Sequence, residues 1–144
     1  MNNLLPSRLA AISDDFLALS DSDRVQFLLE FALELPELPE RYRDHPELFE
    51  RVEECQSPVY IFVELDDADC VQVFATAPEQ APTTRGFASI LATGLSGLSV
   101  AEVLKVSDDF PNMLGLTKII SPLRLRGMGG MLRRIKRQVV EKSS

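Results

Sequence analysis

The sequence contains few of the residues that build metal centres, disulfide frameworks and nucleotide sites. Among its 144 residues are two cysteines, one histidine and seven glycines. Two cysteines make no disulfide framework, and with a single histidine we expect no zinc site built from Cys and His. The glycines form neither a G-x-G-x-x-G motif nor a Walker-type loop, so the sequence does not support a nucleotide site of the common kinds.

Long apolar runs are also missing. No stretch approaches the roughly 20 residues that span a membrane, and the N-terminus, MNNLLPSRLAAISDDF, lacks the basic start and apolar stretch of a signal peptide. We therefore expect a cytoplasmic protein with no membrane partner. The composition, 45% hydrophobic and 26% charged, is that of an ordinary globular protein, and we expect residues 1–144 to form one domain.

Charge is spread unevenly along the chain, whose net charge is −7. Residues 118–144 hold eight Lys or Arg and one Glu, a charge of +7, which leaves −14 on residues 1–117. A basic C-terminal segment on an acidic body indicates either electrostatic docking within the protein or a charged surface for a partner. Nucleic acid is not an expected partner, because the acidic body would repel phosphate.

The spacing of apolar residues predicts helices in the first and last thirds of the chain. Leu9, Ile12 and Phe16 recur at helical spacing. A second helix is predicted between the N-cap candidate Ser20 and Pro36, which ends it. In the last third we expect a helix capped by Thr83 or Thr84, a short helix with a capping box of Ser99 and Glu102, a short turn from Ser107 to near Gly115, and a long amphipathic helix after Ser121-Pro122.

The middle third predicts a small sheet. Residues 59–63 (VYIFV) are β-branched and aromatic, and residues 70–75 alternate apolar side chains on one face. A polar turn at 66–69 joins the two segments into an antiparallel hairpin. Because helices and strands are segregated along the chain, we expect an α+β fold with a small antiparallel β-sheet covered on one face by helices.

Cys55 is the residue best placed to carry chemistry. It lies in EECQSPVY, just before the first strand, so we expect its thiol on a loop, where it could meet another protein and exchange sulfur without a cofactor. Glu53 and Glu54 disfavour the thiolate, so activation would have to come from Arg85, Arg124 or a group on a partner. From the local sequence, a small inert residue at the strand entrance is an equally weighted interpretation.

Cys70 and His45 have simpler interpretations. Cys70 falls within the second predicted strand, where its small size is sufficient reason for it. His45 could in principle act as a base for Cys55. Its neighbours Asp44 and Glu47, however, form a capping-box pattern, which favours a histidine at a helix start.

The C-terminal helix combines glycines with a basic stripe. Glycines 127, 129 and 130 lie near its start, where each costs about 1 kcal/mol relative to alanine, so we expect close backbone packing there. The four basic residues between Arg133 and Arg137 form either a solvated face, which we favour, or a docking site for a partner.

Three segments resemble those of a known family. Residues 51–61 (RVEECQSPVYI) resemble the active-cysteine loop of SufE-type sulfur acceptors. Residues 84–104 (TRGFASILATGLSGLSVAEVL) are similar to that family's central helix and the turn after it. Residues 121–135 (SPLRLRGMGGMLRRI) resemble its closing motif, Ser-x-x-Arg-x-x-Gly, and the amphipathic helix that follows. The resemblance spans most of the chain in the family's order.

The resemblance implies a SufE-like fold and a sulfur carrier that is not itself an enzyme. Cys55 matches the family's persulfide-carrying cysteine, Gln56 and Ser57 match the residues after it, and Arg124 and Gly127 match motif residues that pack near the cysteine loop. The implied donor is a PLP-dependent cysteine desulfurase of the SufS type, which the carrier stimulates. The implied receiver is the Suf scaffold complex for iron–sulfur cluster assembly. PLP belongs to the donor, so this chain needs no cofactor.

The family pattern also implies a resting loop that tucks its thiol into an apolar pocket and swings out to react. Many members have glycine before the cysteine, whereas this chain has Glu54, which makes the loop stiffer and more negative.

The sequence is also compatible with two other functions. One is a binding module that activates a desulfurase without a covalent step. The other is a small cysteine hydrolase, for which no motif indicates an orienting group or an oxyanion hole.

Overall fold

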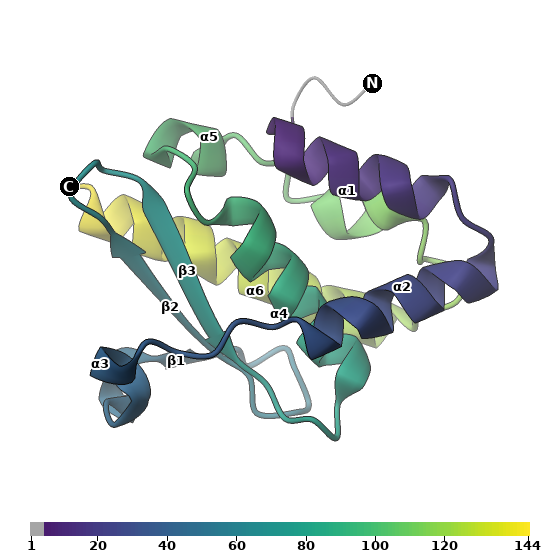
Figure 1. Cartoon of the computed structure of the whole chain (residues 1–144), viewed down its shortest axis with the longest axis horizontal. Coiled ribbons are helices and arrows are strands. Elements are labelled where there is room, and N and C mark those ends of the chain that lie inside the picture. The colour runs from purple at the N-terminus through teal and green to yellow at the C-terminus, as the bar shows by residue number, and fades with distance from the viewer. Residues whose placement is uncertain (1–4) are drawn as a thin grey trace.

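The computed structural model describes residues 5–144. Its elements run in the order α1 (Ser7–Leu17), α2 (Asp21–Leu33), α3 (Glu40–Arg43), the 3₁₀ helix η1 (Pro46–Leu48), β1 (Glu50–Arg51), β2 (Tyr60–Leu65), β3 (Val71–Thr76), α4 (Pro82–Leu95), α5 (Val100–Leu104), the 3₁₀ helix η2 (Phe110–Leu114) and α6 (Pro122–Lys142). The sheet lies at one end of the molecule, α1 and α2 lie at the other, and α4 and α6 run between them (Figure 1). The predicted α+β class is confirmed.

The sheet is antiparallel with strand order β1-β2-β3, and β2 pairs with β3 in a register that places Val63 opposite Val73. Side chains on successive residues point to opposite faces, so one face collects the apolar set. That face is buried under α4, which packs on β3, and α6, which packs on β2. Its buried residues are Ile61, Val63, Val71, Val73 and Ala75.

The other face of the sheet carries a smaller aromatic cluster. The rings of Phe62 and Phe74 lie 5.1 and 5.4 Å from the ring of Tyr42, between centroids. Phe49, just after η1, packs 5.4 Å from Phe62. The long helices thus cover one face, as expected, and the α3–η1 segment covers part of the other.

The local start signals are confirmed at some helices and wrong at others. Ser20 caps α2, since its hydroxyl accepts from the Asp23 N–H at 3.3 Å, and Ser99 forms the full capping box of α5. The prediction of Thr83 or Thr84 as a cap is wrong: α4 already starts at Pro82, after Ala81, with no side-chain cap. Proline is well suited to this first position, because its fixed φ is helical and it has no N–H to satisfy.

The long helix α6 completes the edge of the sheet that the two-residue strand β1 leaves open. The side chain of Gln138 accepts from the Val63 N–H at 2.9 Å, and the ammonium of Lys142 donates to the Val63 carbonyl. These bonds satisfy backbone groups that would otherwise be unpaired at an edge. They also anchor the C-terminal half of α6 on β2, so the glycine-rich first half lies against the loop between β1 and β2.

No helix within residues 5–144 is long and apolar enough to cross a membrane.

Candidate functional site

The loop between β1 and β2 holds Cys55. Its backbone is closed by two hydrogen bonds: the Val52 N–H donates to the Val59 carbonyl at 2.9 Å, and the Cys55 N–H donates to the Val52 carbonyl at 3.1 Å. Cys55 itself is in neither a helix nor a strand. The predicted loop position is confirmed, and the turn directs the thiol inward toward α6.

The thiol of Cys55 is covered by α6 at Gly127. The residue is 7% exposed, and a Cβ atom built on Gly127 would lie only 2.9 Å from the sulfur. Cβ atoms essentially never approach so closely, so a larger residue at 127 would displace the sulfur. The prediction that the α6 glycines allow close packing is confirmed here, and two residues that the sequence placed in separate motifs meet.

A surface cavity of about 250 Å³ opens beside the thiol. It is lined by residues 54–57 of the loop, residues 80–84 at the start of α4, and Leu123, Arg124 and Gly127 of α6. All five residues that the sequence assigned to the site therefore border one cavity. The side chains of Gln56 and Ser57 make no hydrogen bond to another described residue, and Leu123 is an exposed apolar side chain at its border.

The thiol is held in its neutral form. Burial and, after it, the charge of Glu54 raise the pKa of Cys55 from 9.0 to about 11. Arg134 and Arg51 act in the opposite direction. The expected effect of Glu54 is confirmed, but the cations that act on the thiol in this structure differ from the two that the sequence indicated.

Those two arginines, Arg85 and Arg124, have other environments. The Arg85 guanidinium donates to the carbonyls of Ala32 and Ala77 at 2.9 and 2.6 Å, so it joins the ends of α2 and β3. Arg124 is exposed, and its guanidinium has no ion pair among the described residues. Arg124 lines the cavity without contacting a carboxylate that would hold it away from the thiol.

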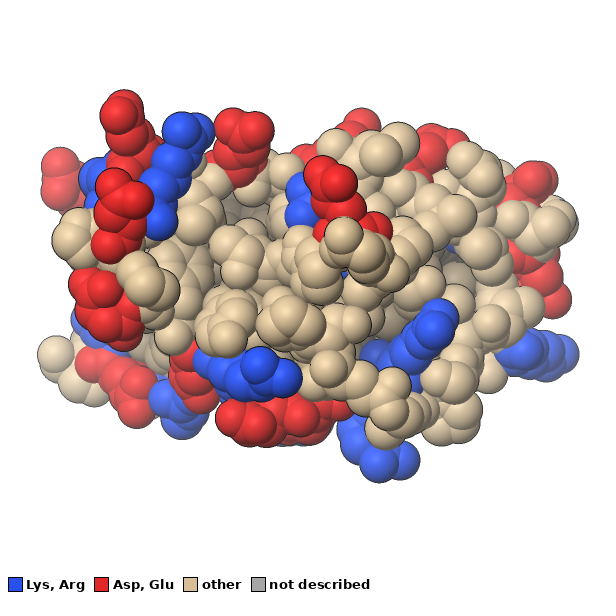
Figure 2. All heavy atoms as spheres, turned by 90° about the horizontal axis from the view of Figure 1, so that it is seen from below, with Lys and Arg blue, Asp and Glu red and all other residues tan. Residues whose placement is uncertain are grey.

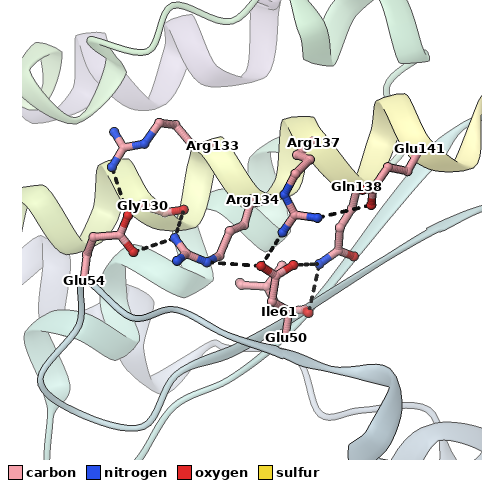
Figure 3. A network of polar contacts seen from close by, with 9 residues as sticks. All are labelled: Glu50, Glu54, Ile61, Gly130, Arg133, Arg134, Arg137, Gln138 and Glu141. Atoms are coloured by element: carbon pink, nitrogen blue, oxygen red, sulfur yellow. Dashed lines mark hydrogen bonds and ion pairs between the residues drawn. The ribbon is translucent and has the colours of Figure 1, made fainter.

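The carboxylate of Glu54 faces α6 and not the solvent. It accepts from Arg134 at 2.5 Å and from Arg133 at 3.2 Å (Figure 3). Gly130 makes room for it, because a Cβ there would lie 2.6 Å from the carboxyl carbon. Burial alone would raise the pKa of Glu54, but hydrogen bonding by its own N–H and the two arginines lower it below its usual value.

Glu50 extends this network toward the sheet. Its carboxylate pairs with Arg137 and, at 3.3 Å, with Arg134, and it accepts from the Gln138 amide at 3.1 Å (Figure 3). Further along α6, Lys136 pairs with Asp108 at 2.8 Å. The basic stripe on α6 is therefore paired largely within the protein, which is one of the two interpretations of the charge pattern. The favoured interpretation of the stripe as a solvated face is wrong for Arg134 and Lys136, whose side chains are mostly covered.

The face seen in Figure 2 shows the same intermingling of charge. Acidic and basic side chains lie beside one another at several places, and a broad uncharged band runs between them. Arg133 and Arg137 remain about half exposed, whereas Arg134 is mostly covered.

The remaining candidate residues lie outside this site. Cys70 lies just before β3 and is partly exposed, and its backbone forms an isolated antiparallel β-bridge with that of Ser99. The Asp44 cap prediction is wrong: Asp44 ends α3, and His45 precedes a three-residue 3₁₀ helix with its ring 2.9 Å from the Glu47 carboxylate. His45 does not line the cavity of Cys55. No group of three or more potential metal ligands exists among residues 5–144.

Comparison with known proteins identifies the family. The family model described as "SufE: Fe-S metabolism associated domain" matches residues 10–139. The chain belongs to the SufE family. It is 49% identical over 137 residues to an uncharacterized SufE-like protein of Mycobacterium tuberculosis, covering 95% of this chain and 94% of that one. It also matches a protein of Plasmodium vivax named cysteine desulfuration protein SufE, at 26% identity over 83 residues, covering 57% of this chain and 34% of that one.

A solved structure supports the same fold. The solution structure of a hypothetical protein from Thermus thermophilus matches with a TM-score of 0.84 and 34% identity, and the match covers 96% of this chain and 98% of that one. Membership of the SufE family links this chain to Fe–S metabolism.

Proposed function

We propose that this chain is a sulfur carrier, in which Cys55 accepts a persulfide from a PLP-dependent cysteine desulfurase of the SufS type and passes the sulfur to the Suf scaffold complex. The observation that carries the proposal is the packing of the Cys55 sulfur on Gly127 beside an open surface cavity. It places a loop cysteine against the closing family motif, at a surface a partner can reach. The partly exposed Cys70 neither packs on a glycine of α6 nor borders this cavity.

The proposed transfer is a thiol exchange. The Cys55 thiolate attacks the outer sulfur of the desulfurase persulfide, forms a new S–S bond, and displaces the desulfurase cysteine as a thiolate. The proton of Cys55 leaves to solvent or to a base on the partner, and the two sulfur centres exchange partners without net oxidation. No cofactor is required on this chain, since PLP acts on the desulfurase.

The burial of the thiol means that this step needs an open loop. In the closed conformation the sulfur is covered by α6, and its raised pKa leaves little thiolate. Docking of the desulfurase at the cavity would expose the thiol and remove the burial that raises its pKa. Gln56, Ser57, Arg124 and Gly127 would then act as residues that shape and support the loop.

The same burial favours a second candidate function. A chain whose thiol is covered and protonated could stimulate a desulfurase through binding alone. The two functions make opposite predictions for the Cys55→Ser variant. A covalent carrier loses stimulation while it still binds the desulfurase, and a non-covalent activator keeps most of its stimulation.

Persulfide mapping tests the proposal directly. The wild-type chain, Cys55→Ser and Cys70→Ser are each incubated with the desulfurase and free cysteine, and peptides are analysed by mass spectrometry without reduction. We expect the mass of one added sulfur on the Cys55 peptide in the wild type and in Cys70→Ser, and on no peptide in Cys55→Ser. Sulfur on the Cys70 peptide, or on neither, would contradict the assignment.

A further inference from the structure

The cysteine loop is hydrogen-bonded to α6 through one side chain. Within the described chain, Glu54 is the only residue between 52 and 59 whose side chain hydrogen-bonds to anything, and both of its partners, Arg133 and Arg134, lie on α6. The other hydrogen bonds of the loop are the two backbone bonds that close its own turn. Apolar packing of Val52, Cys55 and Val59 also holds the loop, but its polar attachment to α6 depends on the residue directly before Cys55.

The environment of Glu54 makes this attachment stronger than an ordinary surface ion pair. The side chain of Glu54 is 25% exposed and that of Arg134 is 17% exposed, so the pair is shielded from much of the solvent. Hydrogen bonds between charged groups are short and strong, and partial burial limits their screening by salt. The Arg134 guanidinium is itself positioned by the carbonyl of Gly130, at 3.2 Å, and by Glu50.

Helix α6 is also shaped to receive this side chain. A glycine at 127 accommodates the Cys55 sulfur, and a glycine at 130, one helical turn later, accommodates the Glu54 carboxyl group. Residues three apart lie on the same face of a helix, so the two glycines leave adjacent spaces on α6 for the side chains of two consecutive loop residues. Glu53, the neighbour on the other side, is exposed and has no partner among the described residues.

We propose that Glu54 is a positioning residue that latches the cysteine loop onto α6 through Arg133 and Arg134, and so sets how often Cys55 opens to solvent. Covered groups react through transient local opening, at a rate proportional to the open population. Removing the latch raises that population. Glu54→Gln also removes a charge that raises the pKa of Cys55, so the test must separate loop opening from thiol ionisation. The inference takes its purpose from the proposed sulfur transfer, but its test uses no desulfurase, so failure of the latch and failure of the acceptor assignment give different results.

The test measures how fast Cys55 is alkylated by iodoacetamide in a Cys70→Ser background, so that one thiol reports. Glu54→Gln removes the charge of the latch. Gly130→Ala keeps every charge and displaces the Glu54 carboxyl group by its methyl alone, while alanine suits the helix. Glu53→Gln is the control for removing one charge from the loop, since it breaks no contact; unlike Glu54, Glu53 does not act on the pKa of Cys55, so the comparison of loop opening rests on the amide exchange. Hydrogen exchange of the amides of residues 52–58 is measured on the same proteins.

We expect Glu54→Gln to raise the alkylation rate and the loop amide exchange about fivefold to tenfold. Gly130→Ala should raise both by less, because the end of the Glu54 side chain can shift to make room for the methyl group. Glu53→Gln should stay within about twofold of the parent in both measurements. The amide exchange does not depend on thiol ionisation, so it separates loop opening from a change in the pKa of Cys55. If the loop amides of Glu54→Gln exchange no faster than those of Glu53→Gln, Glu54 is not a latch.

Discussion

The raised pKa of Cys55 makes a quantitative prediction about its reactivity. Burial, and next to it the charge of Glu54, move the pKa from 9.0 to about 11. Near neutral pH a shift of about two pH units lowers the thiolate fraction about 100-fold, because each unit is a factor of ten. We therefore expect alkylation of Cys55 at pH 7 to be at least about 100-fold slower than that of an exposed thiol with a pKa of 9.0.

The pH profile of alkylation tests this value. In Cys70→Ser protein, the logarithm of the alkylation rate of Cys55 should rise by about one for each pH unit up to about pH 10, whereas a thiol with a pKa of 9.0 levels off near pH 9. Alkylation occurs in the open loop, but most molecules are closed and their thiols stay protonated until the pH approaches the pKa of the closed form. The rate therefore keeps rising up to that pKa, and the profile reports the pKa of Cys55 in the closed loop. A plateau below about pH 9 would refute the reasoning.

The raised pKa of Cys55 also makes the free energy of unfolding fall as the pH rises. The pKa of Cys55 is higher in the folded protein than in the unfolded chain, so the protonated thiol favours the folded state. Its contribution to the free energy of unfolding is complete below about pH 9 and is lost as the pH rises from about 9 to about 11. Between about pH 8 and pH 10 the free energy of unfolding should fall about 1 kcal/mol more in the wild type than in Cys55→Ala. Urea unfolding of both proteins measures the difference, in which contributions from other titrating groups cancel. Equal losses in the two proteins would contradict the raised pKa.

Two other predictions follow from the contacts of α6. Gly127→Ala should expose the Cys55 sulfur and raise its alkylation rate severalfold, while the gain in helix propensity limits the loss in free energy of unfolding to about 2 kcal/mol; an unchanged rate would show that Gly127 does not set the position of the thiol. Replacing the half-exposed Arg137, which does not contact Glu54, with Glu should weaken desulfurase binding severalfold at low salt and less at high salt, as calorimetry can measure. Lys118→Glu, on an exposed lysine outside α6, is the control, and equal losses would point to net charge instead of docking.

The parts of the fold that follow from local patterns could be predicted from the sequence. The hairpin of β2 and β3 follows from a β-branched and aromatic run and from alternation, and α6 follows from the Ser121-Pro122 break and a long amphipathic pattern. The two-residue strand β1 could not, because Glu50 and Arg51 are too short a run to show alternation, and they become a strand only by pairing with β2. The cap at Asp44 failed for a related reason: the segment after it makes one 3₁₀ turn, and side-chain capping has little to stabilise there.

At the site, the position of the reactive thiol could be predicted from the sequence, but the side chains that surround it could not. Cys55 on a loop follows from its neighbours, and family resemblance pointed to Arg124 and Gly127. Glu53 and Glu54 look equivalent in sequence, yet one faces solvent and the other faces α6. The one available signal was the contrast between a +7 C-terminal segment and a −14 body, which indicated that acidic side chains would meet the basic helix without saying which.

The geometry around Cys55 gives a physical reason why a sulfur carrier would keep its thiol in so unreactive a state. An exposed thiolate is open to oxidants and small disulfides, and its attack rate depends on the thiolate fraction and on access. Burial under Gly127 lowers both at once, and opening of the loop restores both at once, since the burial that covers the sulfur is also the main cause of its raised pKa.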